Sequence, residues 1–168
     1  MPSPVAVSAD VSAELSLWRD VVALRGTIER ALEQRLHRDA GISVVDFDIL
    51  TTLSAAEGGQ LRARALGESL GWEKSRLSHQ VSRMVTRGLV TRQDCPTDLR
   101  GTWIVISDHG RAAAAKGSPG HADVLSAHFG SLDVDARAAL ETAIRRVIAS
   151  SDAPSCEAID DSADCRPL

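Results

Sequence analysis

The sequence lacks several features that mark common functional classes. It contains no tyrosine, and aromatic residues make up only 3% of its 168 residues. No apolar run approaches the ~18 residues that a membrane-spanning helix requires. The opening residues, Met-Pro-Ser-Pro, have neither the basic nor the apolar region of a secretion signal. We therefore expect a protein of the cytoplasm with no membrane partner.

Cysteine and histidine are too few and too scattered for a metal site. Cys95, Cys156 and Cys165 form no Cys-x-x-Cys pair and no zinc-ligand spacing with histidine. A reducing cytoplasm also disfavours a structural disulfide. No nucleophile-elbow or phosphate-loop motif occurs, and no room remains for a catalytic domain. We expect no metal, no cofactor and no enzymatic activity.

Acidic residues outnumber basic ones over the whole chain, but the basic residues are concentrated in one segment. The formal net charge is −4, which taken alone argues against binding to a polyanion. Residues 62–111 nevertheless hold nine Lys or Arg against five acidic residues, a net +4, and the remainder carries −8. A local basic segment of this kind favours contact with nucleic acid.

That segment contains two short helices separated by a glycine. Ala63, Leu66 and Leu70 share one side of the first helix, and Gly71 supplies the turn. The second helix, predicted from Trp72 to Gly88, has an apolar stripe at i, i+4 and i+7, formed by Leu77, Val81 and Met84. Two amphipathic helices joined in this way indicate a helix-turn-helix, whose second helix fits the major groove of DNA.

A hairpin follows the second helix. We predict strands over residues 89–92 and 102–107, joined by a polar loop over residues 93–101. Gln60 and Leu61 are expected to add a third short strand. A hairpin placed directly after such a helix is a wing.

These motifs resemble one known family. Arg83-Met-Val-Thr-Arg-Gly-Leu-Val90, then Asp94 and Pro96, then Asp98-x-Arg100 and Ile104-x-Ile-Ser-Asp-x-Gly-Arg111, are similar to the MarR family of winged-helix transcription regulators. The resemblance covers roughly residues 12–150. The chain departs from the family at Ile106-Ser107, where Leu-Thr is usual, and at Gly117-Ser-Pro-Gly120, where the family has an unbroken helix.

The expected fold is mainly α with a small β-hairpin wing (α+β). Residues 1–11 form a mobile tail, residues 43–107 a winged helix-turn-helix lobe, and residues 151–168 a disordered acidic tail. Residues 12–38 and 108–150 supply dimerisation helices, which the resemblance implies are intertwined in a homodimer. We expect Ser43 to cap a helix ending near Ala56, Asp133 to cap the last helix, and the chain to kink or break at Gly117-Ser-Pro-Gly120.

Candidate DNA-contacting side chains gather on the exposed face of the second helix and on the wing. Arg76 is the first choice for bidentate recognition of guanine. Arg83 and Arg87 lie later in the helix and contact either phosphates or the protein itself. Arg100 resembles the family arginine that enters the minor groove, and Asp98 would orient it; an ordinary turn is the alternative. The full DNA-binding set is Lys74, Ser75, Arg76, Ser78, His79, Arg83, Arg100 and Arg62, although simple solvation of a charged face remains open, especially for Arg62.

Two further candidates concern regulation. Trp18, His37 and Phe47 could line a pocket for a small-molecule effector, with the dimer core as the alternative for Trp18. Cys95 could sense oxidants if its thiol pKa were lowered, which neighbouring Arg92 favours and Asp94 opposes.

The sequence thus favours a sequence-specific regulator of transcription, most often a repressor in this family. It would act as a homodimer on a palindromic double-stranded operator and be released by an effector. Two alternatives stay open: a winged-helix docking or dimerisation module that binds no DNA, and a thiol redox-sensing regulator acting through Cys95.

Overall fold

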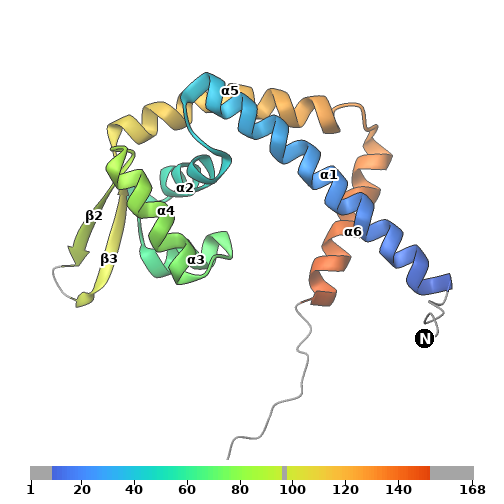
Figure 1. The fold of residues 1–168 in the computed structure, drawn as a ribbon, viewed down its shortest axis with the longest axis horizontal. Helices are drawn as coiled ribbons and strands as arrows, with labels where there is room; N and C mark the ends of the chain where they lie inside the picture. The colour runs from blue at the N-terminus through green and yellow to red at the C-terminus, as the bar shows by residue number, and fades with distance from the viewer. Residues whose placement is uncertain (1–8, 96–97, 152–168) are drawn as a thin grey trace, which may run out of the picture. The chain divides into compact units, whose positions relative to one another are not determined.

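The computed structural model describes residues 9–95 and 98–151 (Figure 1). The elements in chain order are α1 (Ala9–Ala40), α2 (Val44–Ala55), the 3-10 turn η1 (Glu57–Gly59), β1 (Gln60–Arg62), α3 (Ala63–Leu70), α4 (Lys74–Thr86), β2 (Val90–Cys95), β3 (Asp98–Ile106), α5 (Asp108–Phe129) and α6 (Val134–Ser151). Contacts divide the chain into a unit that ends at His128 and a second unit, containing α6, that begins at Phe129. In the described ranges no helix is both long and apolar enough to cross a membrane.

The helix α2 begins and ends where its sequence predicts. Ser43 Oγ accepts a hydrogen bond from Asp46 N at 3.0 Å, and Ser43 N donates to Asp46 Oδ2 at 3.0 Å, which completes a capping box. After Ala55 the chain turns through Gly58 and Gly59, whose φ angles of 66° and 70° suit glycine. This turn delivers the chain to β1.

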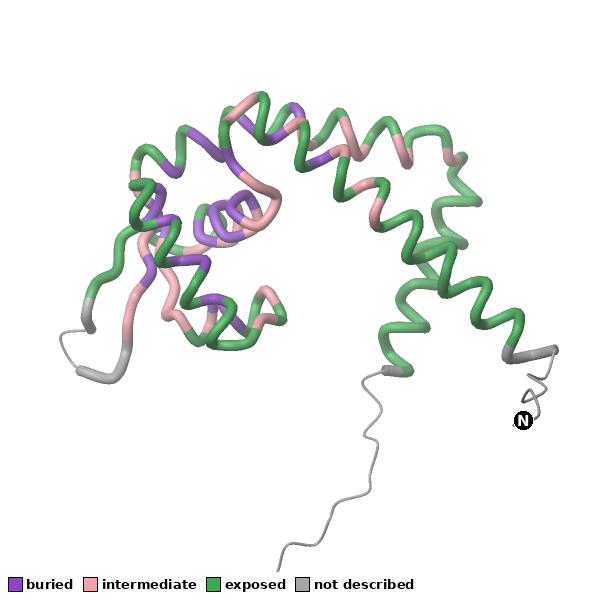
Figure 2. Tube along the Cα trace, in the orientation of Figure 1, coloured by how far each residue is buried: buried purple, intermediate pink, exposed green. Residues whose placement is uncertain are grey.

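The hydrophobic core lies in the first unit, between α2, α3, α4, the sheet and the adjoining parts of α1 and α5. Figure 2 shows buried residues concentrated there, whereas α6 and the N-terminal half of α1 are exposed. The predicted stripes on α3 and α4 are confirmed by burial of Leu66, Leu77, Val81 and Met84. The remaining core side chains are Leu36, Ile42, Phe47, Ile49, Leu50, Leu53, Leu89, Val90, Ile104, Ile106, Ala113 and Ala114.

The sheet has three antiparallel strands in the order β1-β3-β2. Leu61 on β1 pairs with Ile104, which confirms the predicted third strand. The predicted loop over residues 93–101 was wrong, because β2 extends to Cys95 and β3 starts at Asp98. Gln93 pairs with Trp103 and Asp94 with Thr102, so the ladder satisfies backbone groups that a loop would leave to water.

The predicted break at Gly117-Ser-Pro-Gly120 was also wrong, because α5 runs from Asp108 to Phe129 as one continuous helix. Gly117 and Gly120 do not form a turn but lie where α5 packs against α1. A Cβ on Gly117 would lie 2.8 Å from Leu36 Cδ2, and one on Gly120 would lie 2.7 Å from Arg35 Nε, so both glycines let α5 approach α1 closely. This packing compensates for the hydrogen bond that Pro119 cannot donate.

Other helix boundaries differ slightly from expectation. α1 starts at Ala9 and ends at Ala40, so it includes part of the predicted 1–11 tail and extends past residue 38. α4 runs over Lys74–Thr86, two residues shorter at each end than predicted, and Gly88 follows with φ 70°. Asp133 Oδ1 accepts from Ala136 N at 2.8 Å, which confirms the predicted cap of α6. Residues 1–8 and 152–168 lie outside the described ranges.

Candidate nucleic-acid interface

The turn between α3 and α4 is fixed by backbone hydrogen bonds. Gly71 adopts the left-handed conformation, with φ 63° and ψ 34°. Gly71 N donates to Glu68 O at 3.2 Å, and Trp72 N donates to Gly67 O at 2.9 Å. This pattern is the Schellman motif, which satisfies carbonyls at a helix end and reverses the chain direction. The angle between the two helices is therefore set locally, by the glycine and its neighbours.

The helix α4 divides sharply into two faces. Leu77, Gln80, Val81 and Met84 are buried. The predicted DNA-contacting residues of its first half are all exposed: Lys74, Ser75, Arg76, Ser78 and His79. Hydroxyl, guanidinium, imidazole and ammonium groups are donors that can address the acceptor-rich edges of bases and the phosphates of DNA.

Arg76 lies against an aromatic ring. Its Cζ is 4.3 Å from the ring centroid of Trp72, in a cation–π arrangement. Trp72 itself is half-buried and packs against the core at the start of α4.

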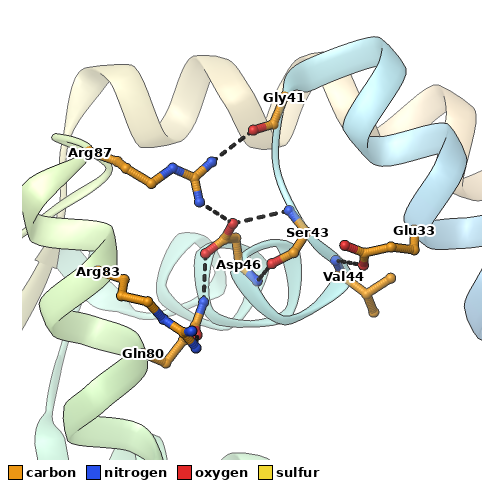
Figure 3. Close-up of polar contacts among 8 residues, drawn as sticks. All are labelled: Glu33, Gly41, Ser43, Val44, Asp46, Gln80, Arg83 and Arg87. Carbon is orange, nitrogen blue, oxygen red and sulfur yellow. Dashed lines mark hydrogen bonds and ion pairs between the residues drawn. The ribbon is translucent and has the colours of Figure 1, made fainter.

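The second half of α4 is tied to α2 by a buried carboxylate (Figure 3). Asp46 has no exposed surface, and it accepts from Gln80 Nε2 at 2.7 Å and from Arg87 Nη1 at 2.6 Å. Arg87 Nη2 also donates to Gly41 O at 2.7 Å, and Arg83 Nη2 donates to Gln80 Oε1. The network thus joins the end of α4 to the N-terminus of α2 and to the α1–α2 connection.

The protonation state of Asp46 follows from these contacts. Burial opposes its ionisation, but hydrogen bonds from Ser43 N, Arg87 and Ser43 Oγ, with the positive charge of Arg87, outweigh burial and lower its pKa below the ordinary value. At Asp48, two residues further along α2, burial raises the pKa, and the charge of His121 opposes that shift. The pKa values of the two carboxyl groups are therefore shifted in opposite directions.

The wing is braced against α4 by an arginine. Arg92 on β2 donates from Nη2 to Ser78 O and to Ser82 Oγ, both at 3.0 Å. On β1, the guanidinium carbon of Arg62 lies 5.5 Å from the ring centroid of Trp103. Arg100, Asp98 and Cys95 belong to strands near the hairpin tip, and their side chains lie outside the described part of the structure. Their predicted roles therefore stay predictions.

A groove of about 930 Å³ runs between α3, the start of α4 and the sheet. Four basic side chains, Arg62, Arg64, Lys74 and Arg92, contribute to its lining, together with Glu68 and Glu73. The other lining residues are Ala63, Gly67, Gly71, Trp72, Leu77, Ser78, Val81, Thr102 and Ile104. The groove therefore joins the helix-turn-helix to the sheet, and its lining carries more basic than acidic side chains.

The structure does not bring the predicted effector-pocket residues together. Trp18 is 63% exposed, and it is separated from His37 by nineteen residues of α1, or about 28 Å along the helix axis. His37 is exposed, while Phe47 is buried and stacks on His121 with ring centroids 4.7 Å apart. None of the three lines the groove beside α4. Among the described residues no cluster of His, Cys, Asp or Glu could hold a metal ion.

Sequence reasoning missed the positioning residues Asp46, Gln80 and Arg92. A local signal existed for Asp46, because an acid three residues after Ser43 is typical of a capping box. No local pattern pairs Asp46 with Arg87, which lies 41 residues further along the chain. For Arg87, the alternative that it contacts the protein is confirmed.

A glycine-linked helix pair followed by a braced antiparallel hairpin defines a winged helix-turn-helix protein. Comparison with known proteins agrees. The sequence profile described as the MarR family matches residues 40–101. Sco3205, a MarR family transcriptional regulator from Streptomyces coelicolor solved in complex with DNA, is 30% identical with a TM-score of 0.78, over 92% of this chain and 95% of that one. This chain belongs to the MarR family of transcriptional regulators.

Two other solved structures are also similar. AbsC, a MarR family transcriptional regulator from Streptomyces coelicolor, is 29% identical with a TM-score of 0.77, over 86% of this chain and 96% of that one. The organohalide-sensing regulator RdhR, solved with bound 2,4-dichlorophenol, is 18% identical with a TM-score of 0.77, over 90% of each chain. At that identity the likeness to RdhR concerns the fold alone. A search of curated protein sequences gave no significant match.

Proposed function

We propose that this chain is a homodimeric repressor that binds a palindromic double-stranded operator. In this proposal α4 enters the major groove and the β2–β3 hairpin reaches the adjacent minor groove. The observation that carries it is the donor-rich, exposed face of α4, held on a buried face that packs into the core. The DNA complex of Sco3205, similar over nearly the whole chain, supports the same use of the fold here.

The candidate residues divide by their place on this surface. Arg76, Ser75 and His79 would contact base edges, while Lys74 and Ser78 would contact bases or the flanking phosphates. Arg100 would enter the minor groove with support from Asp98. Arg62 and Arg83 contact Trp103 and Gln80 within the protein, and we assign both side chains to phosphates and not to base edges.

The dimer is proposed from exposed apolar surface. Leu17, Trp18 and Leu24 on α1 are 64%, 63% and 47% exposed, and Ile144 and Ile148 on α6 are 49% and 57% exposed. Two helices that each expose an apolar face favour burial against another chain. A two-fold dimer would also present two copies of α4 to successive turns of one duplex, about 34 Å apart.

Regulation by a small molecule is the third part of the proposal. RdhR with bound 2,4-dichlorophenol shares this fold, and a ligand that binds one spacing of the two DNA-binding lobes more tightly shifts the population toward it. Trp18, His37 and Phe47 could contribute to such a site only through both subunits, because Trp18 and His37 are far apart within one chain. As a regulator of chromosomal genes, the protein would act in the cytoplasm, and we assign it no catalytic activity.

The test is selection of an operator followed by measurement of affinity. Random duplexes would be enriched on the wild-type protein, and the best sequence titrated in a mobility-shift assay at two salt concentrations. We expect tight binding that salt weakens and that non-specific competitor does not abolish. Arg76→Ala should lose on the order of 1–3 kcal/mol of binding free energy and relax the choice of base at one position.

Arg25→Ala is the matched control, because Arg25 is an exposed arginine on α1 that pairs only with Glu29 in the described structure. It removes the same charge away from α4 and should leave operator affinity unchanged. Enrichment of no sequence, or equal losses in the two variants, would refute the proposal and favour a docking module that binds no DNA.

A further inference from the structure

Trp72 is the one large aromatic residue at the start of α4, and its position does not depend on DNA. Its backbone N is held by Gly67 O at 2.9 Å, and its ring packs against the hydrophobic core. Gly67 lies close beneath, since a Cβ there would come within 3.2 Å of Trp72 O. The backbone of Trp72 is therefore held at the end of α3, and its half-buried indole, packed against the core, forms a platform at the edge of the DNA-facing surface.

Arg76 uses this platform and, among the described residues, has no hydrogen-bond acceptor or ion-pair partner. The other arginines around α4 have such partners: Arg64 binds Glu68, Arg87 binds Asp46, Arg83 binds Gln80 and Arg92 binds Ser78 and Ser82. Arg76 instead lies over the Trp72 ring at 4.3 Å. The N–H groups of its guanidinium are therefore available to a ligand, while the contact with the Trp72 ring restricts where the guanidinium lies.

The geometry of a guanidinium makes that combination useful. Stacking occupies a face of the planar group, whereas its N–H donors point outward in the plane. A stacked arginine can therefore present its donor edge to the O6 and N7 acceptors of a guanine without leaving the ring. It also loses less side-chain freedom on binding, because the protein has restricted it beforehand.

We propose that Trp72 is a positioning residue for DNA recognition, which holds Arg76 for bidentate contact with a guanine edge in the major groove. The inference rests on the proposed function, since it assigns a role within operator binding. It concerns specificity more than general affinity, because Trp72 adds no charge toward the phosphates.

The experiment uses the full-length protein and the operator selected by the wild type. Dissociation constants for that operator, for versions with one base pair changed, and for a random duplex are measured for wild type, Trp72→Leu, Trp72→Phe and Arg76→Ala. Trp72→Leu keeps an apolar side chain but removes the π face, and Trp72→Phe restores a smaller one. Thermal unfolding establishes that each variant is folded.

We expect Trp72→Leu to weaken operator binding by about two- to fivefold, the value of an exposed cation–π contact. Arg76→Ala should identify one base pair of the operator whose substitution no longer changes affinity. Trp72→Leu should reduce discrimination at that same base pair and at no other. Its affinity for the random duplex should not change. Trp72→Phe should recover part of the loss. In the Arg76→Ala background, Trp72→Leu should have no further effect.

A DNA-free measurement completes the test. Ring current from Trp72 should shift the Arg76 side-chain NMR resonances, and Trp72→Leu should return them to ordinary positions. The role of Trp72 is overturned if Trp72→Leu leaves operator affinity unchanged, or if it weakens binding equally in the presence and absence of Arg76. Neither result would contradict the proposed function. A wild-type protein that prefers no duplex refutes the proposed function and, with it, this role for Trp72, even where the ring-current shift is present.

Discussion

Arg87 Nη1 at the end of α4 lies 2.6 Å from Oδ2 of Asp46, a carboxylate on α2 with no solvent exposure. The ion pair joins two helices that are distant in sequence, and it holds the C-terminal end of α4 against the N-terminal turn of α2. A buried carboxylate held by several donors loses much of its stabilising effect when its charge is removed. The contact therefore connects the stability of the domain with the placement of α4, the helix that we propose contacts DNA.

Asp46→Asn should destabilise the protein by ~2 kcal/mol at neutral pH, because it replaces hydrogen bonds to a charged acceptor with weaker or mismatched ones. Urea unfolding followed by circular dichroism measures the change. Asp48→Asn is the matched control two residues along α2. Burial raises the pKa of Asp48, so removal of its charge should be neutral or slightly stabilising. Equal losses of unfolding free energy in the two variants would contradict the stabilising role assigned to the Asp46 carboxylate.

The pH dependence of stability should differ between the same two variants. The folded-state pKa of Asp46 lies below its ordinary value of 3.8, so its contribution is present above that value and is lost as pH falls through the folded pKa. The stability difference between wild type and Asp46→Asn should therefore shrink on acidification below about pH 4. For Asp48, whose pKa is raised, stability is lost as pH rises through the folded pKa. Unfolding curves from pH 3 to 7 measure both differences, and a constant Asp46→Asn difference across this range would exclude the linkage.

Gly110→Ala should destabilise the protein by ~1–3 kcal/mol, because an added Cβ would overlap Leu89 O and lie 2.9 Å from Leu50 Cδ2. The backbone carbonyl cannot rotate away as a side chain could. Gly26→Ala on α1 is the control, since its Cβ would meet only the flexible end of Arg30 at 3.3 Å. That variant should gain ~0.5–1 kcal/mol from helix propensity. Thermal melts of the two proteins should shift in opposite directions.

Ile144→Asp should convert the proposed dimer into a monomer, because it places a charge in the apolar stripe of α6. Light scattering after gel filtration measures the mass, and the monomer should also bind a two-half-site operator far more weakly. Arg146→Asp changes an exposed, polar position of the same helix and should leave the dimer intact. A wild-type protein that is monomeric at micromolar concentration would refute the dimer.

The elements that sequence predicted well are those defined by neighbouring residues. The stripe of Leu77, Val81 and Met84 and the Ser43 cap depend on spacings of three or four residues, which periodicity reveals. Gly117-Ser-Pro-Gly120 was misjudged because its local preference to break a helix is overridden by close packing against α1. The wing loop was misjudged because its polar residues are held in strands by pairing between β2 and β3. Pairing of this kind is not visible in the pattern of neighbouring residues. The bond between Asp46 and Arg87 was invisible for the same reason.

The division of α4 into two faces has a consequence for how such regulators diverge. The side chains that hold the helix in place, among them Gln80 and Met84, are separate from Ser75, Arg76 and His79, which point away from the core. Substitutions at these three exposed positions leave the hydrophobic core and the Asp46 network untouched, so they alter stability little. If these side chains read the operator as proposed, one copy of a duplicated gene can acquire a new operator preference through a few such changes while the fold is inherited intact.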